Sequence, residues 1–158
     1  MDRPGWEDYF MKIASDVSLR SNCSRRHIGA VIVGPHHEIV STGYNGTPAG
    51  TTNCYEGGCP RCAGDAEPGT GYDLCLCVHA EENAMLLCSR DRLWNHMIVV
   101  TARPCIICLR HIIVKQIKVV LWLYDNFTLY DAATEKAYYQ LANQGEVTIK
   151  HIPTSELE

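Results

Sequence analysis

Residues 97–124 read MIVVTARPCIICLRHIIVKQIKVVLWLY and decide the fold. The β-branched run 97–101 predicts a strand, and Pro104, at the favoured first position of a helix, predicts a helix that continues to about Lys115. The run 117–123 is apolar except at Lys118 and predicts a second strand of the kind found where both faces of a sheet are covered. The segment therefore predicts the strand–helix–strand centre of an α/β protein.

The segments on either side extend this pattern. They add three helices and three strands, expected at 6–17, 79–88 and 131–143 for the helices and at 28–33, 38–43 and 146–152 for the strands. Asp131 is expected to cap the last helix and Gly145 to stop it. The order predicts a mixed sheet of about five strands with helices on both faces, which is a three-layer α/β/α sandwich.

Composition limits the classes of function. The chain has 158 residues, of which 46% are hydrophobic, and is expected to form a single domain over 1–158. Its 14 basic and 18 acidic side chains give a net charge of −4, which argues against a nucleic-acid polymer as partner because such binders carry a basic surplus. No apolar run reaches the roughly 18 residues of a membrane span, and residues 1–6 lack the features of a signal peptide. We expect a cytoplasmic protein without a membrane partner.

The nine cysteines are the strongest compositional signal. Their odd number and the two C-x-x-C pairs favour metal chelation over disulfides. The loop at about 44–78 is rich in Gly, Pro, Thr and Asn and can bury little core, so a structural zinc is expected to pin it. Cys59 and Cys62 have the best chelating spacing, and Cys75 or Cys77 could close the loop back on them. The candidate ligands of this zinc are Cys23, Cys54, Cys59, Cys62, Cys75 and Cys77.

Two further motifs, HAE at 79–81 and PCIIC at 104–108, fall at the starts of predicted helices. One imidazole and two thiolates from neighbouring helix starts can meet at one ion and leave the fourth tetrahedral position for water, which is the pattern of a catalytic zinc. We therefore predict His79, Cys105 and Cys108 as its ligands. Glu81 follows the histidine by two residues and is expected to carry a proton from water to a leaving group.

The pairing of H-x-E with P-C-x-x-C is the signature of zinc-dependent nucleobase deaminases. From about residue 6 to 153 the chain resembles the deoxycytidylate (dCMP) deaminases, and its cysteine-rich segment is most similar to the fungal branch of that family. The segments that carry the resemblance are RSNCSRRHIGAVIV at 20–33, GYNGTP at 43–48, CYEGGCPRC at 54–62 and HAEENA at 79–84.

The resemblance implies a cytidine-deaminase-like fold, hydrolysis of dCMP to dUMP and ammonia in pyrimidine deoxynucleotide metabolism, and a homohexamer. Many relatives are also activated by dCTP and inhibited by dTTP, each with Mg²⁺, and use positions like Cys23 and Cys54 for a second zinc. Relatives usually have Gly where this chain has Gln116, which is expected to alter a turn only. They often carry an aromatic residue near the active site, for which the candidates are Tyr124, Phe127 and Tyr130.

Substrate contacts are expected from a cluster of basic residues just before the first strand. The cluster consists of Arg20, Arg25, Arg26 and His27. A guanidinium there can bind phosphate oxygens in bidentate fashion, and the alternative is a solvated surface charge. Related deaminases use the residue that matches Asn45 to hold the sugar or the base. The candidate substrate-binding residues are Asn45, Ala80, Arg25 and Arg26.

Two alternative functions stay open. The same deoxycytidine pocket could accept dCTP in place of dCMP, or both, giving a dCTP deaminase or a bifunctional enzyme. A non-catalytic zinc-binding module would instead have closed four-ligand sites and no acid beside them. Glu81 next to an incomplete ligand set argues against that module.

Overall fold

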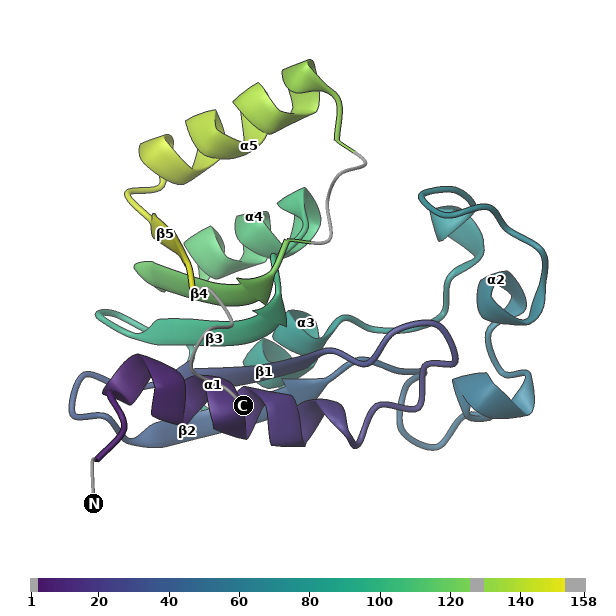
Figure 1. Ribbon diagram of the computed structural model, residues 1–158, viewed down its shortest axis with the longest axis horizontal. Helices are drawn as coiled ribbons and strands as arrows, with labels where there is room; N and C mark the ends of the chain where they lie inside the picture. Colours follow the sequence, from purple (N-terminus) through teal and green to yellow (C-terminus); the bar gives the residue numbers. More distant parts are fainter. Residues whose placement is uncertain (1–2, 126–129, 153–158) are drawn as a thin grey trace.

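The computed structural model describes residues 3–125 and 130–152. At its centre is a five-stranded sheet with the order β2-β1-β3-β4-β5 (Figure 1). The pairs β1–β2 and β1–β3 are antiparallel, whereas β3–β4 and β4–β5 are parallel, so the predicted mixed sheet is confirmed. The strands are β1 (Gly29–Val33), β2 (Ile39–Tyr44), β3 (Met97–Ala102), β4 (Val119–Tyr124) and β5 (Thr148–His151).

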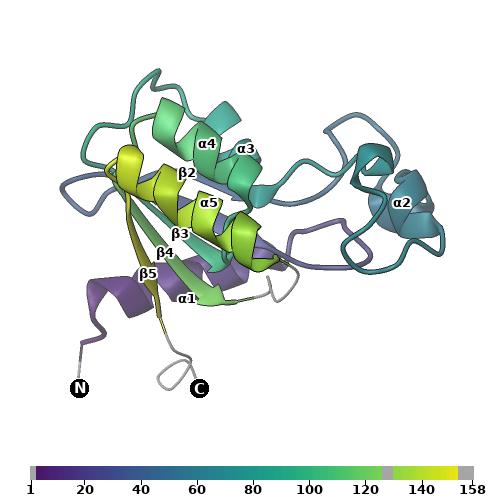
Figure 2. The ribbon, with the colours of Figure 1, turned by 90° about the horizontal axis from the view of Figure 1, so that it is seen from above.

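Helices cover both faces of this sheet, which confirms the three-layer sandwich. One face is covered by α1 and the other by α3, α4 and α5, as the view from above shows (Figure 2). These helices are α1 (Trp6–Ser18), α3 (Ala80–Leu86), α4 (Ile106–Val114) and α5 (Ala132–Gln144). Within the described residues, no helix combines the length and apolar character that crossing a bilayer requires.

The strands β3 and β4 contribute to both cores. Val99 and Leu121 pack beneath α1, whereas their neighbours Ile98 and Val120 are buried on the side of α3, α4 and α5. Because successive strand residues point to opposite faces, a strand buried on both sides must be apolar throughout. This explains why residues 119–123 lack the polar alternation of a half-exposed strand.

The cysteine-rich segment projects from the sheet as a small lobe (Figure 1). It contains the short helix α2 (Pro60–Ala63) and two 3₁₀ turns, η1 (Cys54–Glu56) and η2 (Tyr72–Leu74), where the sequence predicted only loop. Elements of three or four residues are too short to show a helical period, so the sequence pattern could not reveal them.

The start of α4 also differs from the prediction. Cys105 is the N-cap, its Sγ accepts a hydrogen bond from the Cys108 N–H at 3.4 Å, and Ile106 is the first helical residue. Pro104 therefore lies ahead of the cap, and its expected place at the first helical position is wrong. The thiol satisfies one of the unpaired N–H groups of the first turn, and this fixes where the helix begins.

At the other end of α4, Gln116 has a φ of 66°. This left-handed conformation suits glycine far better than a residue with a side chain. Gln116 therefore adds backbone strain where the resemblance gives glycine, and the expectation that only the turn is altered stays a prediction.

Helix α3 lies directly on β2, and Gly43 makes this approach possible. A Cβ atom at residue 43 would lie 2.3 Å from both the Ala80 carbonyl oxygen and the Ala84 nitrogen. A larger residue would push α3 away from the sheet. Since His79 is the N-cap of α3, the glycine also sets the position of His79.

A buried ion pair joins the segment before α4 to α5. The Arg103 side chain is 3% exposed and donates to both carboxylate oxygens of Glu135, at 3.0 and 2.8 Å. Its guanidinium also lies over the ring of Tyr138, 4.3 Å from the centroid. This contact fixes α5 against the connection that leads from β3 to Cys105.

We expect Glu135→Ala to lower the free energy of unfolding by about 1.5–3 kcal/mol, because it removes both short hydrogen bonds of a buried guanidinium and leaves it only the half-exposed Asp125, at 3.6 Å. Urea denaturation measures this. The matched control is Glu146→Ala, which removes an acid that is 84% exposed and 3.5 Å from Lys118, and should cost less than about 1 kcal/mol. Equal losses in the two variants would contradict a structural role for the Arg103 pair.

Candidate active site

The structure brings together the side chains of His79, Cys105 and Cys108. The Nδ1 atom of His79 lies 3.6 Å from the Sγ of Cys105 and 3.3 Å from the Sγ of Cys108. Zinc bonds of usual length give a tetrahedral N···S edge of about 3.6 Å, so these atoms already have the spacing of a zinc site. Within the described residues, these three are the only His, Cys, Asp or Glu side chains in this group. Three protein ligands leave one coordination position open.

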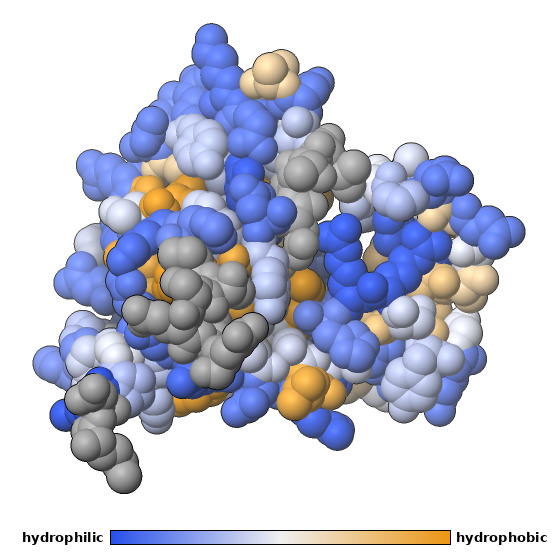
Figure 3. Space-filling view, viewed as in Figure 1, coloured by the Kyte–Doolittle hydropathy of each residue, from blue (hydrophilic) through white to orange (hydrophobic). Residues whose placement is uncertain are grey.

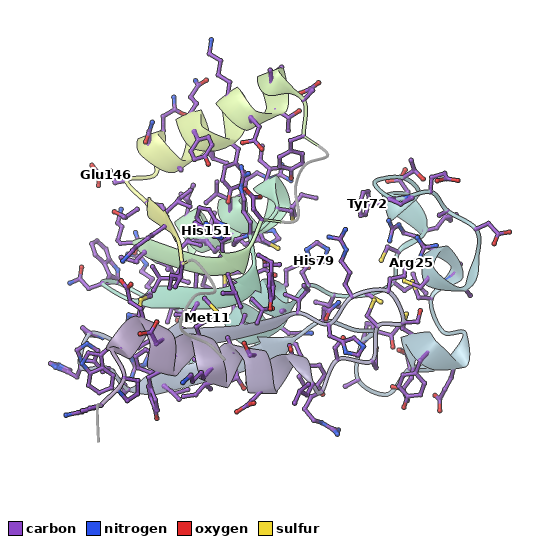
Figure 4. The ribbon with its side chains drawn as sticks, viewed as in Figure 1. Met11, Arg25, Tyr72, His79, Glu146 and His151 are labelled. Carbon is purple, nitrogen blue, oxygen red and sulfur yellow. The ribbon has the colours of Figure 1, made fainter. Side chains whose placement is uncertain are left out.

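The fold explains this convergence. Cys105 follows β3 by three residues, and His79 begins the helix that rests on β2 and β1. The Arg103 N–H donates to the Tyr124 carbonyl at 3.0 Å, which ties together the carboxyl ends of the parallel strands β3 and β4. Ligand sites in α/β proteins are usually built at this end of a parallel sheet. In Figure 4, His79 lies between the sheet and the lobe.

Glu82 is a functional residue that the sequence analysis missed. One oxygen of its carboxylate accepts a hydrogen bond from the His79 N–H at 3.1 Å, and the other lies 3.5 Å from Nδ1 of His111. It thereby holds the backbone of the histidine at the start of α3. The signal was present, because an acid three residues after an N-cap is typical of a capping box.

Glu81 lies in the first turn of α3 and is 4% exposed. Burial raises the pKa of this carboxyl to about 7, although the charge at His79 acts in the opposite direction. Near neutral pH both protonation states are therefore accessible. A buried acid with such a pKa beside an open metal position is suited to proton transfer.

The sulfur and imidazole groups also influence one another. The hydrogen bond with Cys108 and then that with His79 lower the pKa of Cys105 to about 4, and the bond with Cys105 raises the pKa of His79 to about 9. The site therefore favours a thiolate at Cys105 even before a metal binds. A thiolate is the form in which cysteine coordinates zinc.

The six other candidate metal ligands gather in the lobe. Five belong to the cysteine-rich segment, and Cys23 joins them from the stretch before β1. They fall into two groups of four sulfurs, and within each group the atoms lie within 4.8 Å of one another. All nine cysteines are free thiols, so no disulfide competes for them. The two groups are Cys23, Cys54, Cys62 and Cys77, and Cys59, Cys62, Cys75 and Cys77.

Two of the predicted substrate-binding residues have partners within the protein. The guanidinium of Arg25 donates to the carbonyl oxygens of Gly64 and Ala66, at 3.0 and 2.8 Å, and so ties the lobe to the segment before β1 (Figure 4). Arg26 is exposed. Because Arg25 already holds two carbonyls, Arg26 is the stronger candidate for a phosphate.

Asn45 and Ala80 are both buried. The Asn45 Oδ1 accepts from the Ser21 hydroxyl at 2.7 Å and the Ile28 N–H at 2.8 Å, and its Nδ2 donates to the Arg26 carbonyl at 2.9 Å. Asn45 thus fixes the segment that leads into β1. Ala80 is the first residue of α3 and is fully buried where this helix packs against β2. A direct contact of either residue with substrate stays a prediction.

Of the three candidate aromatic residues, Tyr130 lies beside the metal ligands. Its hydroxyl accepts a hydrogen bond from the Ile106 N–H at 3.1 Å, next to Cys105. Tyr124 ends β4 and is half exposed, and Phe127 lies outside the described residues. The structure therefore favours Tyr130 as the aromatic residue at the site.

Comparisons with known proteins agree with this geometry. Residues 4–124 match the family model described as the cytidine and deoxycytidylate deaminase zinc-binding region. A deoxycytidylate deaminase of Schizosaccharomyces pombe is 50% identical over 107 residues, which are 67% of this chain and 33% of that protein. One of Saccharomyces cerevisiae is 40% identical over 156 residues, covering 98% of this chain and 47% of that protein. The chain thus spans between a third and a half of these fungal relatives.

A solved structure is similar along nearly the whole chain. It is the dCMP deaminase of the cyanophage S-TIM5 in complex with dCMP and dUMP, which superposes with a TM-score of 0.72 at 26% sequence identity. The match covers 96% of this chain and 100% of the phage chain.

Proposed function

The chain belongs to the cytidine and deoxycytidylate deaminase zinc-binding family, and from this we propose that it catalyses the hydrolytic deamination of dCMP to dUMP and ammonia. The observation that carries the proposal is the buried carboxyl of Glu81 beside the three-ligand group of His79, Cys105 and Cys108. The fungal relatives named deoxycytidylate deaminase and the phage enzyme with dCMP and dUMP support this choice of substrate.

His79, Cys105 and Cys108 would hold a zinc ion, which lowers the pKa of a water molecule and so makes it nucleophilic at neutral pH. The water oxygen forms a bond to the amine-bearing ring carbon, the bond from that carbon to the amino nitrogen breaks, and ammonia leaves. Glu81 would pass one proton of the water to the ring nitrogen next to that carbon and the other to the departing amino nitrogen, so that the carbon is left as a carbonyl. Burial raises the pKa of this carboxyl, which helps the same group to hold and release a proton in both steps.

The substrate proposal is tested by comparing kcat/KM for dCMP, dCTP and deoxycytidine, measured as ammonia release. We expect dCMP to exceed deoxycytidine by at least about 10²-fold, the effect of one or two charge-assisted hydrogen bonds to phosphate. Equal efficiency of dCMP and deoxycytidine would contradict the proposal. A dCTP value within tenfold of that for dCMP would favour the bifunctional alternative, and absence of turnover with all three would favour the non-catalytic module.

Assembly and regulation belong to the same proposal. Leu86 and Val114 are largely exposed and line one hollow between α3 and α4, and this apolar surface supports self-association of the chain. A homohexamer, as well as control by dCTP and dTTP with Mg²⁺, stays a prediction that rests on the resemblance.

A further inference from the structure

The core of the lobe consists of cysteine side chains. Its buried side chains are those of Cys23, Cys54 and Cys59, and the partly buried groups packed against them are the three remaining lobe cysteines. Four large apolar residues of the lobe are more than half exposed, namely Tyr55, Tyr72, Leu74 and Leu76. Figure 3 shows the lobe surface as mostly blue to white, unlike the orange areas over the sheet. Without apolar packing, the lobe needs another source of stability.

We propose that the six lobe cysteines hold two zinc ions in one binuclear cluster, with Cys62 and Cys77 each bridging both metals. Cys23 and Cys54 would complete the tetrahedron of one zinc, and Cys59 and Cys75 that of the other. The proposal is independent of the deamination reaction and of the His79 site.

The arrangement of the sulfurs carries this assignment. The two four-sulfur groups share two members, Cys62 and Cys77, and no others. Two separate tetrahedral zinc sites would need eight ligands, so six thiolates can complete two tetrahedra only if two of them are shared. The structure thus brings together six sulfurs, which is the number of ligands that two tetrahedra with a common edge require.

The measured spacings fit this geometry. The Sγ atoms of Cys23 and Cys62 are 4.0 Å apart, and so are those of Cys59 and Cys75. Zinc–sulfur bonds of usual length give a tetrahedral S···S edge of about 3.8 Å. The first distance joins an unshared to a shared sulfur, and the second joins two unshared sulfurs, so both kinds of edge have the expected length.

Backbone donors reach two of the four unshared sulfurs, one in each group. The Ser24 N–H donates to Cys54 Sγ at 3.5 Å, and the Leu76 N–H donates to Cys59 Sγ at 3.3 Å. A thiolate bound to one metal keeps more negative charge than one shared by two, so donors are most useful at the unshared positions.

The cluster would also position the start of α3. Cys77 precedes His79 by two residues, and Val78 between them pairs with Gly46 through backbone hydrogen bonds of 2.8 and 3.1 Å. Cys23 belongs to the segment whose Asn22 accepts from the Thr47 N–H at 2.9 Å. The metals therefore would join three stretches of chain next to the candidate active site.

Metal counting by native mass spectrometry tests the cluster on the full chain. The wild-type protein purified with zinc should hold three ions, two in the lobe and one at His79. In Cys105→Ser, which lacks a ligand of the His79 site, two should remain. A single remaining zinc in that variant would overturn the cluster, whether or not the wild-type protein deaminates dCMP.

Replacement with ¹¹³Cd tests the bridging directly, because two cadmium ions that share thiolates show mutual spin coupling in the NMR spectrum. We expect two coupled tetrathiolate resonances, and uncoupled resonances would overturn the proposal. Cys75→Ser should cost one lobe metal, whereas Cys62→Ser, which breaks both tetrahedra, should cost both. Equal loss in the two variants would contradict the bridging role of Cys62.

Discussion

Replacing Glu81 with Gln is expected to lower kcat for dCMP by at least about 10²–10⁴-fold, while zinc content and nucleotide binding are kept. The amide has almost the same shape as the carboxylate and fits the same buried place in the first turn of α3. It cannot accept a proton from water at neutral pH, so both proton transfers are lost. Steady-state kinetics, metal analysis and calorimetric titration with dUMP separate these effects.

The neighbouring acid offers a matched control. Glu82→Gln keeps an oxygen that can accept the His79 N–H bond and leaves Glu81 in place, so it should reduce kcat much less than Glu81→Gln. If Glu81→Gln retained activity within tenfold of the wild-type value, another group would have to move the proton.

Elements with a clear local pattern were predictable from the sequence. The helix capped by Asp131, whose carboxylate accepts from the Thr134 N–H at 2.7 Å, and the doubly buried strand β4 are confirmed. The information for both lies within a few consecutive residues, because caps and periodicity are local properties. The H-x-E and P-C-x-x-C motifs are also local, because each can be recognised within a few consecutive residues.

Features that depend on distant partners were not predictable. Arg103 and Glu135 are 32 residues apart in the sequence, and nothing in either segment indicates the other. Arg25 looks like a free phosphate ligand until the fold places Gly64 and Ala66 against it. Likewise, spacing predicts that the lobe cysteines chelate metal, but only the fold reveals that Cys62 belongs to both groups.

Replacing Cys105 with Ser is expected to remove one zinc per chain and all measurable activity. Serine keeps its proton at neutral pH and is a much poorer ligand for zinc than a thiolate, so only His79 and Cys108 would remain to hold the ion. The protein should still fold, because serine is a good N-cap and can accept the Cys108 N–H in place of the thiol. Zinc analysis, kinetics and a melting curve measure the three consequences.

Cys88→Ser is the control for this substitution. Cys88 is a partly buried thiol that packs against the main core and belongs to none of the three candidate metal groups, so its variant should keep both zinc content and activity. Full zinc content in Cys105→Ser would contradict the assignment of this ligand. The variants Glu81→Gln and Cys105→Ser separate two roles at the site. Loss of the Glu81 carboxylate should stop proton transfer at an intact metal centre. Loss of the Cys105 thiolate should remove the metal while Glu81 stays in place.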